Sequence, residues 1–221
     1  MVTFLHYLDG SEFSLEDRVN AIFEELGISV EQQEAIKSFL APIKVKDQST
    51  YEHCLRVGIL AKAIGDFIHF DGRALFYSGI LHDIGKAMTK QATLQNKGDW
   101  SPEDAEEIKS HVVDGYRLIR DYFDFSAEII LWHHRFQKGG YPETLPPPLH
   151  GYSEGTKAMI PLYGRMLALA DAFDALHRVN SKFGLLTGEL IKVKMFEFNP
   201  DQKVLLTQLY ELEIFTTHIV E

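Results

Sequence analysis

The stretch LHDIGK, residues 81–86, places His82 beside Asp83 at the end of a segment with the apolar composition of a buried helix. Gly85 permits the chain to turn there, so both side chains can point toward one site at a helix end. Imidazole nitrogen and carboxylate oxygen together suit iron, manganese, zinc, cobalt or nickel. The pair therefore predicts part of a metal site whose other ligands come from elsewhere in the chain.

Helix start signals occur on both sides of this stretch. Three segments begin with a serine suited to cap a helix, namely Ser14, Ser29 and Ser101. The first of these helices is expected to end at Gly27, and the second to stop before Pro42. These signals predict capped, amphipathic helices rather than strands.

Apolar residues also recur at helical spacing over residues 51–70, and residues 126–135 and 160–179 supply two further apolar helices. A Gly/Pro-rich loop over about 137–159 separates the last two, and loops of that length are often functional. The sequence has no sustained strand alternation, internal repeat or heptad run. The fold class is therefore expected to be all-α, built as a helical bundle.

The length of 221 residues suffices for one sizeable core with an appended lobe. We expect the first two helices to form a small N-terminal helical lobe over residues 1–45. The main domain is expected over residues 46–205, followed by a C-terminal helical tail over residues 206–221.

The charge and composition exclude several classes of function. A formal net charge of -10 argues against binding duplex nucleic acid, because that binding needs a basic face. The sequence has no apolar run long enough for a membrane span and no secretory signal pattern at its N-terminus, so a cytoplasmic protein without membrane contact is expected. The single cysteine, Cys54, agrees with a reducing compartment and is expected to be a small buried apolar residue.

Five further residues stand where helical packing can bring them to the His-Asp pair: His53, His111, His133, His134 and Asp171. Taken singly, each has an ordinary structural explanation as a hydrogen-bonded core residue or a partner of a helix end. Taken together on separate apolar helices, they would be costly to bury without a metal or a partner. The joint pattern therefore favours a metal centre.

The order of these residues also resembles a known family. LHDIGK, EEIKSHVVDGYRLI, the His133-His134 pair followed by GGYP, and RMLALADAFDAL together resemble the HD-domain superfamily of metal-dependent phosphohydrolases, and within it the HD-GYP subgroup. The resemblance covers roughly residues 46–205 and implies an HD-domain helical bundle.

The resemblance implies two divalent transition metals, with iron or manganese favoured and zinc, cobalt or nickel as alternatives. It implies one metal held by His53, His82, Asp83 and Asp171, and a second held by His111, His133 and His134, with Asp83 as the bridge. Asp83 and Lys86 are the expected catalytic residues, Lys86 facing the substrate phosphate. Two such metals can clamp a phosphoryl group and lower the pKa of a bridging water. Ser49 stands where some members have a glutamate that allows a third metal, so two metals are expected.

The loop after the histidine pair departs from the subgroup pattern. HHRFQKGGYP is one residue shorter, with Arg135 at the usual glutamate position and Lys138 near the usual aspartate position. These cations could hold a terminal phosphate or a different cyclic dinucleotide. Tyr141 could stack on a base or pack under the loop. Lys97 in NKGDW could reach ligand or solvent, and Lys86 completes the candidate substrate contacts.

The expected function is that of a phosphodiesterase that hydrolyses a cyclic dinucleotide such as cyclic di-GMP by attack of a metal-bound hydroxide. One alternative is a nucleotide phosphomonoesterase or triphosphohydrolase on the same scaffold. Another is a non-catalytic signalling module that binds a cyclic dinucleotide. A homodimer is compatible with the sequence.

Overall fold

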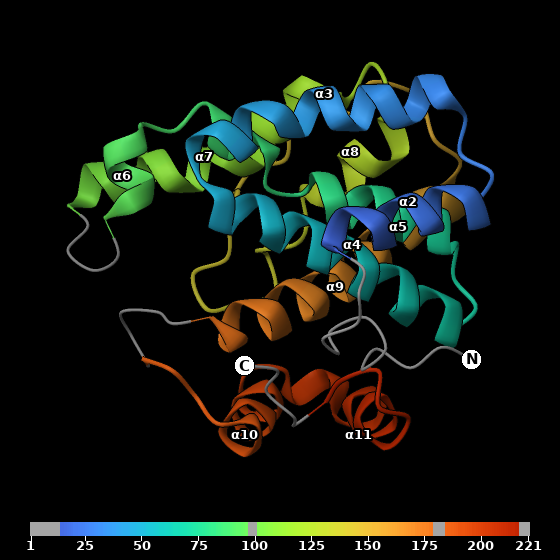
Figure 1. Cartoon of the computed structure of the whole chain (residues 1–221), viewed down its shortest axis with the longest axis vertical. Coiled ribbons are helices and arrows are strands. Elements are labelled where there is room, and N and C mark those ends of the chain that lie inside the picture. Colours follow the sequence, from blue (N-terminus) through green and yellow to red (C-terminus); the bar gives the residue numbers. More distant parts are fainter. Residues whose placement is uncertain (1–13, 97–100, 179–183, 217–221) are drawn as a thin grey trace.

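The computed structural model describes residues 14–96, 101–178 and 184–216, which fold into helices joined by turns (Figure 1). The α-helices are α2 (Leu15–Glu25), α3 (Val30–Lys46), α4 (Gln48–Phe67), α5 (Gly72–Leu81), α6 (Gln91–Gln95), α7 (Pro102–Ile119), α8 (Asp124–Ile130), α9 (Glu154–His177), α10 (Gly188–Phe198) and α11 (Lys203–Glu211). Two 3₁₀ turns, η1 (Ile84–Ala87) and η2 (Pro200–Gln202), complete the order. The expected all-α class is confirmed.

The serine caps lie where the sequence predicted them. The Ser14 hydroxyl accepts from the Asp17 N–H, and the Asp17 carboxylate accepts from the Ser14 N–H in return, which forms a capping box. Ser101 and Asp104 form the same box at the start of α7. These caps satisfy backbone donors that have no partner within the helix.

Three predicted boundaries were wrong. Helix α3 does not stop before Pro42 but continues to Lys46. Pro42 lies on the exposed face of α3, as does Ser38, so water can reach the carbonyl that the proline leaves without a donor. The predicted loop at 137–159 is shorter, because Ser153 caps α9 and the helix begins at Glu154 and includes Pro161. The helix predicted over 126–135 is α8, which already ends at Ile130.

One cluster of buried apolar side chains extends from Val19 in α2 to Phe215 beyond α11. Helix α2 packs against α4, and α3 packs against α4, α5 and η1. The two helices of the expected N-terminal lobe thus share a core with the rest of the described chain, and the domain boundaries themselves stay a prediction. Figure 1 shows α9 inside the bundle, with α10 and α11, in red, on its far side from α3.

Helices α4 and α5 form the most extensive helix pair, and two glycines allow their close approach. A Cβ at Gly79 would lie 2.7 Å from the Cα of Gly58 and 2.8 Å from the Val57 carbonyl oxygen. Side chains there would push the two helices apart. This contact brings His53 of α4 close to His82, which directly follows α5.

In the parts of the chain that the structure describes, no helix has the length and apolar content needed to cross a bilayer.

Candidate metal centre

All seven predicted ligands converge at the centre of the bundle. His53 comes from α4, His82 from the end of α5, Asp83 from the start of η1, His111 from α7, His133 and His134 from the turns after α8, and Asp171 from α9. Their potential ligand atoms form three overlapping groups within which all atoms lie within 4.8 Å of one another. Six different segments thus supply donors to one small volume.

On one side of this cluster, two histidines face two carboxylates. The His53 Nε2 atom lies 3.2 Å from His82 Nε2 and 3.1 Å from Asp171 Oδ1. The His82 Nε2 atom lies 3.4 Å from Asp83 Oδ2 and 3.7 Å from Asp171 Oδ1. These are the four residues predicted to share the first metal.

The two oxygens of Asp83 face different histidines. Oδ2 lies on the side of His53 and His82, whereas Oδ1 lies 3.1 Å from His111 Nε2. The His111 Nε2 atom in turn lies 3.4 Å from His133 Nε2. A carboxylate placed between two groups of imidazoles has the geometry of a bridging ligand.

Backbone carbonyls orient three of the histidines. The Nδ1 atom of His82 lies 2.8 Å from the Gly79 carbonyl oxygen. In both His111 and His133, the Nδ1 atom lies 2.5 Å from the carbonyl oxygen three residues earlier. Donation from Nδ1–H leaves the Nε2 lone pair directed into the cluster. The tautomer that a metal requires is therefore set by the backbone turn that precedes each ring.

His53 is oriented by a residue that the sequence reasoning missed. Its Nδ1 lies 2.7 Å from Asp174 Oδ2, and the same carboxylate accepts from Arg56 Nε at 2.6 Å and Nη2 at 3.2 Å. Asp174 is 5% exposed. The available signal was its spacing: Asp174 lies three residues after Asp171, on the same face of α9.

The protonation states of three ligands suit metal binding, whereas Asp83 and Asp171 raise the pKa of His82 against the effect of burial, so a cation must displace a proton there. Burial would raise the pKa of the Asp83 carboxyl, but His82 and Lys86 hold this pKa well below its usual range. Burial would likewise raise the pKa of the Asp171 carboxyl, but the neighbouring histidines hold this pKa well below its usual range. Burial lowers the pKa of His134 to about 3. Ionised carboxylates and neutral imidazole are the forms that bind a cation.

The histidine pair lies in turns rather than in a helix. Successive side chains of an α-helix diverge by about 100°, so a helix would direct the two rings to different sides. Here the rings of His133 and His134 lie 4.0 Å apart between centroids, and both belong to the group that contains Asp83 and His111. Ending α8 at Ile130 therefore allows both imidazoles to face the cluster.

The glycine of LHDIGK has a packing role. A Cβ on Gly85 would overlap the backbone carbonyl of His111 in α7. Glycine is needed at this position because η1 and α7 approach each other at backbone distance. The contact fixes Asp83 relative to His111.

A second residue that sequence reasoning missed supports η1 from outside. The Lys46 Nζ atom at the end of α3 donates to the Ala87 carbonyl at 2.6 Å and to the Thr89 carbonyl at 2.5 Å. Inside the turn, Lys86 Nζ lies 2.5 Å from Asp83 Oδ2. Helix α3 thus helps to hold the segment that carries both predicted catalytic residues.

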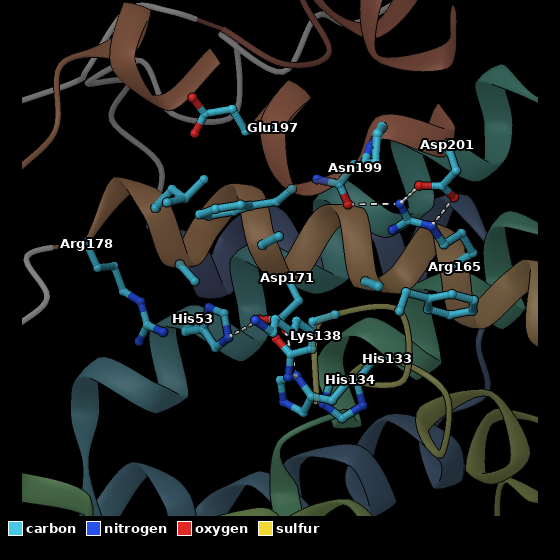
Figure 2. Close-up of a pocket in the computed structure, with 18 of the residues that line it drawn as sticks. His53, His133, His134, Lys138, Arg165, Asp171, Arg178, Glu197, Asn199 and Asp201 are labelled. Atoms are coloured by element: carbon cyan, nitrogen blue, oxygen red, sulfur yellow. Dashed lines mark hydrogen bonds and ion pairs between the residues drawn. The ribbon is translucent and has the colours of Figure 1, made fainter. Parts of the chain in front are cut away.

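A cavity of about 740 Å³ opens next to the cluster (Figure 2). Ligands that line it include His53, His133, His134 and Asp171. Lys86 and Lys138 also line it, so two of the predicted substrate contacts border the cavity. Lys97 lies outside the described residues.

Two other predicted substrate contacts have structural partners. The Arg135 guanidinium donates to the carbonyls of Pro142 and Glu143 and stacks on Trp132, with 5.1 Å from its Cζ atom to the ring centroid. This gives Arg135 a role in holding the loop, and its contact with substrate stays a prediction. The Tyr141 ring packs on His134, with centroids 4.6 Å apart, which agrees with the packing alternative.

The donor set fits metal ions. Asp83 is 1% exposed, and its Oδ1 atom has no hydrogen-bond partner within the described residues. A buried carboxylate oxygen without a donor is costly unless a cation or another partner satisfies it. Imidazole nitrogens and carboxylate oxygens in one cluster match the preferences of divalent transition metals.

The HD domain family model matches residues 50–176, more than half of the chain. The chain belongs to the HD domain family. The match contains all seven predicted ligands, whereas α2, α3, α10 and α11 lie outside it.

The curated relatives of this HD domain protein are phosphodiesterases, in agreement with the HD-GYP resemblance. A cyclic di-GMP phosphodiesterase from Thermotoga maritima is 29% identical over 182 residues, which cover 79% of this chain and 46% of that protein. The 3'3'-cGAMP-specific phosphodiesterase 1 of Vibrio cholerae is 30% identical over 163 residues, covering 70% of this chain and 35% of the relative. The chain thus spans less than half the length of these relatives.

A solved HD domain has the same fold. The HD domain of the L. monocytogenes phosphodiesterase PgpH matches with a TM-score of 0.52 and 18% sequence identity, covering 75% of this chain and 84% of that chain.

Proposed function

We propose that this HD domain protein is a metal-dependent phosphodiesterase that hydrolyses a cyclic dinucleotide such as cyclic di-GMP. The observation that carries the proposal is the convergence of five histidines and two aspartates beside a cavity large enough for a nucleotide. Relatives that act on cyclic di-GMP or 3'3'-cGAMP support this substrate class.

The proposed cofactor is a pair of divalent transition metals. The first metal would be held by His53, His82, Asp83 and Asp171, and the second by His111, His133, His134 and the other oxygen of Asp83. Bound there, the metals would polarise the phosphoryl oxygens and lower the pKa of a water between them.

The residues of the chain prepare this chemistry in the absence of substrate. The backbone and Asp174 fix the imidazole tautomers, so ligand lone pairs point inward before any ion binds. Lys86 sits beside Asp83 and lines the cavity, where its ammonium can stabilise negative charge on a phosphoryl group. Lys138 lines the same cavity and is exposed, so it is proposed to bind a phosphate.

The test pairs metal content with product analysis. Protein purified without chelator should carry close to two transition metals per chain and should convert cyclic di-GMP to a linear dinucleotide or GMP. The matched variant Asp83→Ala should lose metal and turnover together. Cleavage of phosphomonoesters or nucleoside triphosphates alone would overturn the phosphodiesterase proposal, and metal-loaded protein that binds cyclic di-GMP without cleaving it would indicate a binding module.

A further inference from the structure

One histidine of the metal cluster, His134, is held differently from the other four. Three of those four face a backbone carbonyl through Nδ1, and His53 faces the buried Asp174 carboxylate. Within the described residues, the hydrogen-bond contact of the His134 ring is with the amide of Gln137, 3.4 Å from Nδ1. Gln137 is exposed, and a hydrogen bond of that length orients a ring only weakly. The direction of this imidazole therefore depends on packing.

The ring of Tyr141 supplies that packing. Its centroid lies 4.6 Å from that of His134, with 31° between the two planes, and its edge contact with His111 spans 6.1 Å between centroids. The Nδ1 atom of His134 lies 4.0 Å from Asp171 Oδ2, and Figure 2 shows His134 below Asp171, beside His133. The imidazole thus has one face against Tyr141 while its Nδ1 edge points toward the cluster. Rotation of the imidazole out of this direction would break the ring contact.

The loop that carries Tyr141 is closed on the histidine pair by hydrogen bonds. The Tyr141 N–H donates to the His134 carbonyl at 3.4 Å. The Arg135 guanidinium reaches across the loop and donates to the carbonyls of Pro142 and Glu143. These bonds join the two ends of the loop, so Tyr141 returns to the residue on which it packs.

Glycine is needed at the point where the loop closes. A Cβ on Gly140 would lie 2.5 Å from the carbonyl oxygen of Arg135 and 2.8 Å from its Cα. The two backbone segments therefore touch directly, which a larger residue would prevent. Because Tyr141 follows Gly140 in the chain, the place of its ring depends on this close approach.

We propose that Tyr141 is a positioning residue that orients His134 for metal binding, and that the loop fastened by Arg135 holds its ring in place. The inference rests on the proposed metal centre, because His134 belongs to the ligand group of the second metal. Residues that orient a metal ligand typically change metal affinity by about 10- to 100-fold. The orienting contact here is made by the face of the tyrosine ring, so a phenyl ring should serve as well.

Metal titration tests the proposal without any substrate. Metal-free protein is titrated with manganese or zinc in competition with a chromophoric chelator. Tyr141→Leu should lower the affinity for one of the two ions by about tenfold and leave the other within about twofold. Tyr141→Phe should keep both affinities within about twofold of wild type. Tyr122→Leu is the matched control, because Tyr122 is 70% exposed, packs on Phe39 at 5.4 Å and does not line the cavity.

A second variant moves the tyrosine without removing it. Gly140→Ala places a methyl group against the Arg135 backbone and should displace the loop. It should therefore weaken the same ion as Tyr141→Leu, although Tyr141 itself is present. A folded Gly140→Ala protein with both affinities unchanged would show that the loop does not hold the ring.

Histidine ring spectra of the metal-free protein supply a readout that needs no ion. The ring protons of His134, assigned by their loss in His134→Gln, should carry a ring-current shift from Tyr141. Tyr141→Leu should remove this shift and Tyr141→Phe should keep it. Unchanged His134 resonances in Tyr141→Leu would overturn the proposal.

The outcomes separate this inference from the proposed function. If the wild type binds two ions and Tyr141→Leu binds both normally, the positioning role is wrong and the metal centre stands. If the wild type does not bind two ions but the His134 resonances depend on Tyr141, the ring contact stands and the proposed metal pair is wrong. If two ions bind and cyclic di-GMP is not cleaved, the phosphodiesterase proposal fails, whereas the metal affinities of the Tyr141 variants still decide the positioning role.

Discussion

Replacing Asp174 with asparagine should weaken metal binding by about 10- to 100-fold, although Asp174 is not itself among the predicted ligands. Its carboxylate is buried and accepts from both His53 and Arg56. Asparagine keeps the shape but removes the charge and turns one acceptor into a donor. That donor then faces either the Nδ1–H of His53 or the guanidinium of Arg56, and one of the two contacts is lost.

The magnitude follows from these contacts. A hydrogen bond to a charged group contributes about 1.5–3 kcal/mol. Each tenfold change in affinity corresponds to about 1.4 kcal/mol, so losing the contact that orients His53 accounts for about one to two orders of magnitude. Loss of the contact to Arg56 should instead lower the free energy of unfolding of the metal-free protein, which makes the two effects separable.

The assay is a competition titration of metal-free protein with manganese or zinc against a chromophoric chelator, alongside urea unfolding of the same samples. Asp66→Asn is the matched control, because Asp66 pairs with Lys62 at 2.7 Å on α4 and its side chain is 52% exposed. A folded Asp174→Asn protein whose metal affinity stays within twofold of wild type would refute the argument that this carboxylate prepares His53.

Further predictions concern the turn that carries LHDIGK. Asp83→Ala should remove both metals, as measured by elemental analysis, because each of its oxygens faces a different group of histidines. Lys86→Ala should retain metal and lower kcat by about 10²–10³; unchanged kcat would exclude contact with the reacting phosphate. Gly85→Ala should lower the free energy of unfolding by about 1–3 kcal/mol, because its Cβ would overlap the α7 backbone, whereas Gly151→Ala has open space and should change it little. Lys46→Met should lower kcat several-fold, whereas Lys46→Arg should keep the wild-type kcat. Equal kcat values in the wild type and both variants would show that α3 does not position η1.

Local signals in the sequence predicted much of the fold. Ser14 and Ser101 begin helices in the structure because capping depends on a few adjacent residues. Pro42 was misinterpreted as a helix end because the outcome depends on whether the freed carbonyl faces water, which is a tertiary property. The start of α9 was predicted at residue 160, although Ser153 caps this helix and Pro161 lies inside it.

The candidate ligands were predictable for a different reason. Buried histidines and aspartates at several separate points of apolar helices have few uses other than a metal, so residue type and order were informative. Asp174 was missed because its role requires knowing that α9 packs against α4, which brings together residues 121 positions apart. The charge of Arg135 suggested a phosphate contact, which stays a prediction. Its hydrogen bonds to the loop carbonyls of Pro142 and Glu143 could not be predicted, because they depend on how the loop folds back.

The two ways of orienting the histidines have a consequence for how the site assembles. His82, His111 and His133 take their orientation from a carbonyl three residues earlier, so each ring is ready as soon as its own turn has formed. His53 becomes ready only when α9 has docked and supplied Asp174. An ion that needs all of these donors therefore binds the protein more tightly when α9 is docked than when it is detached, and by linkage it stabilises the docked state. A bound metal would thus hold α9 against α4, in addition to any part in chemistry.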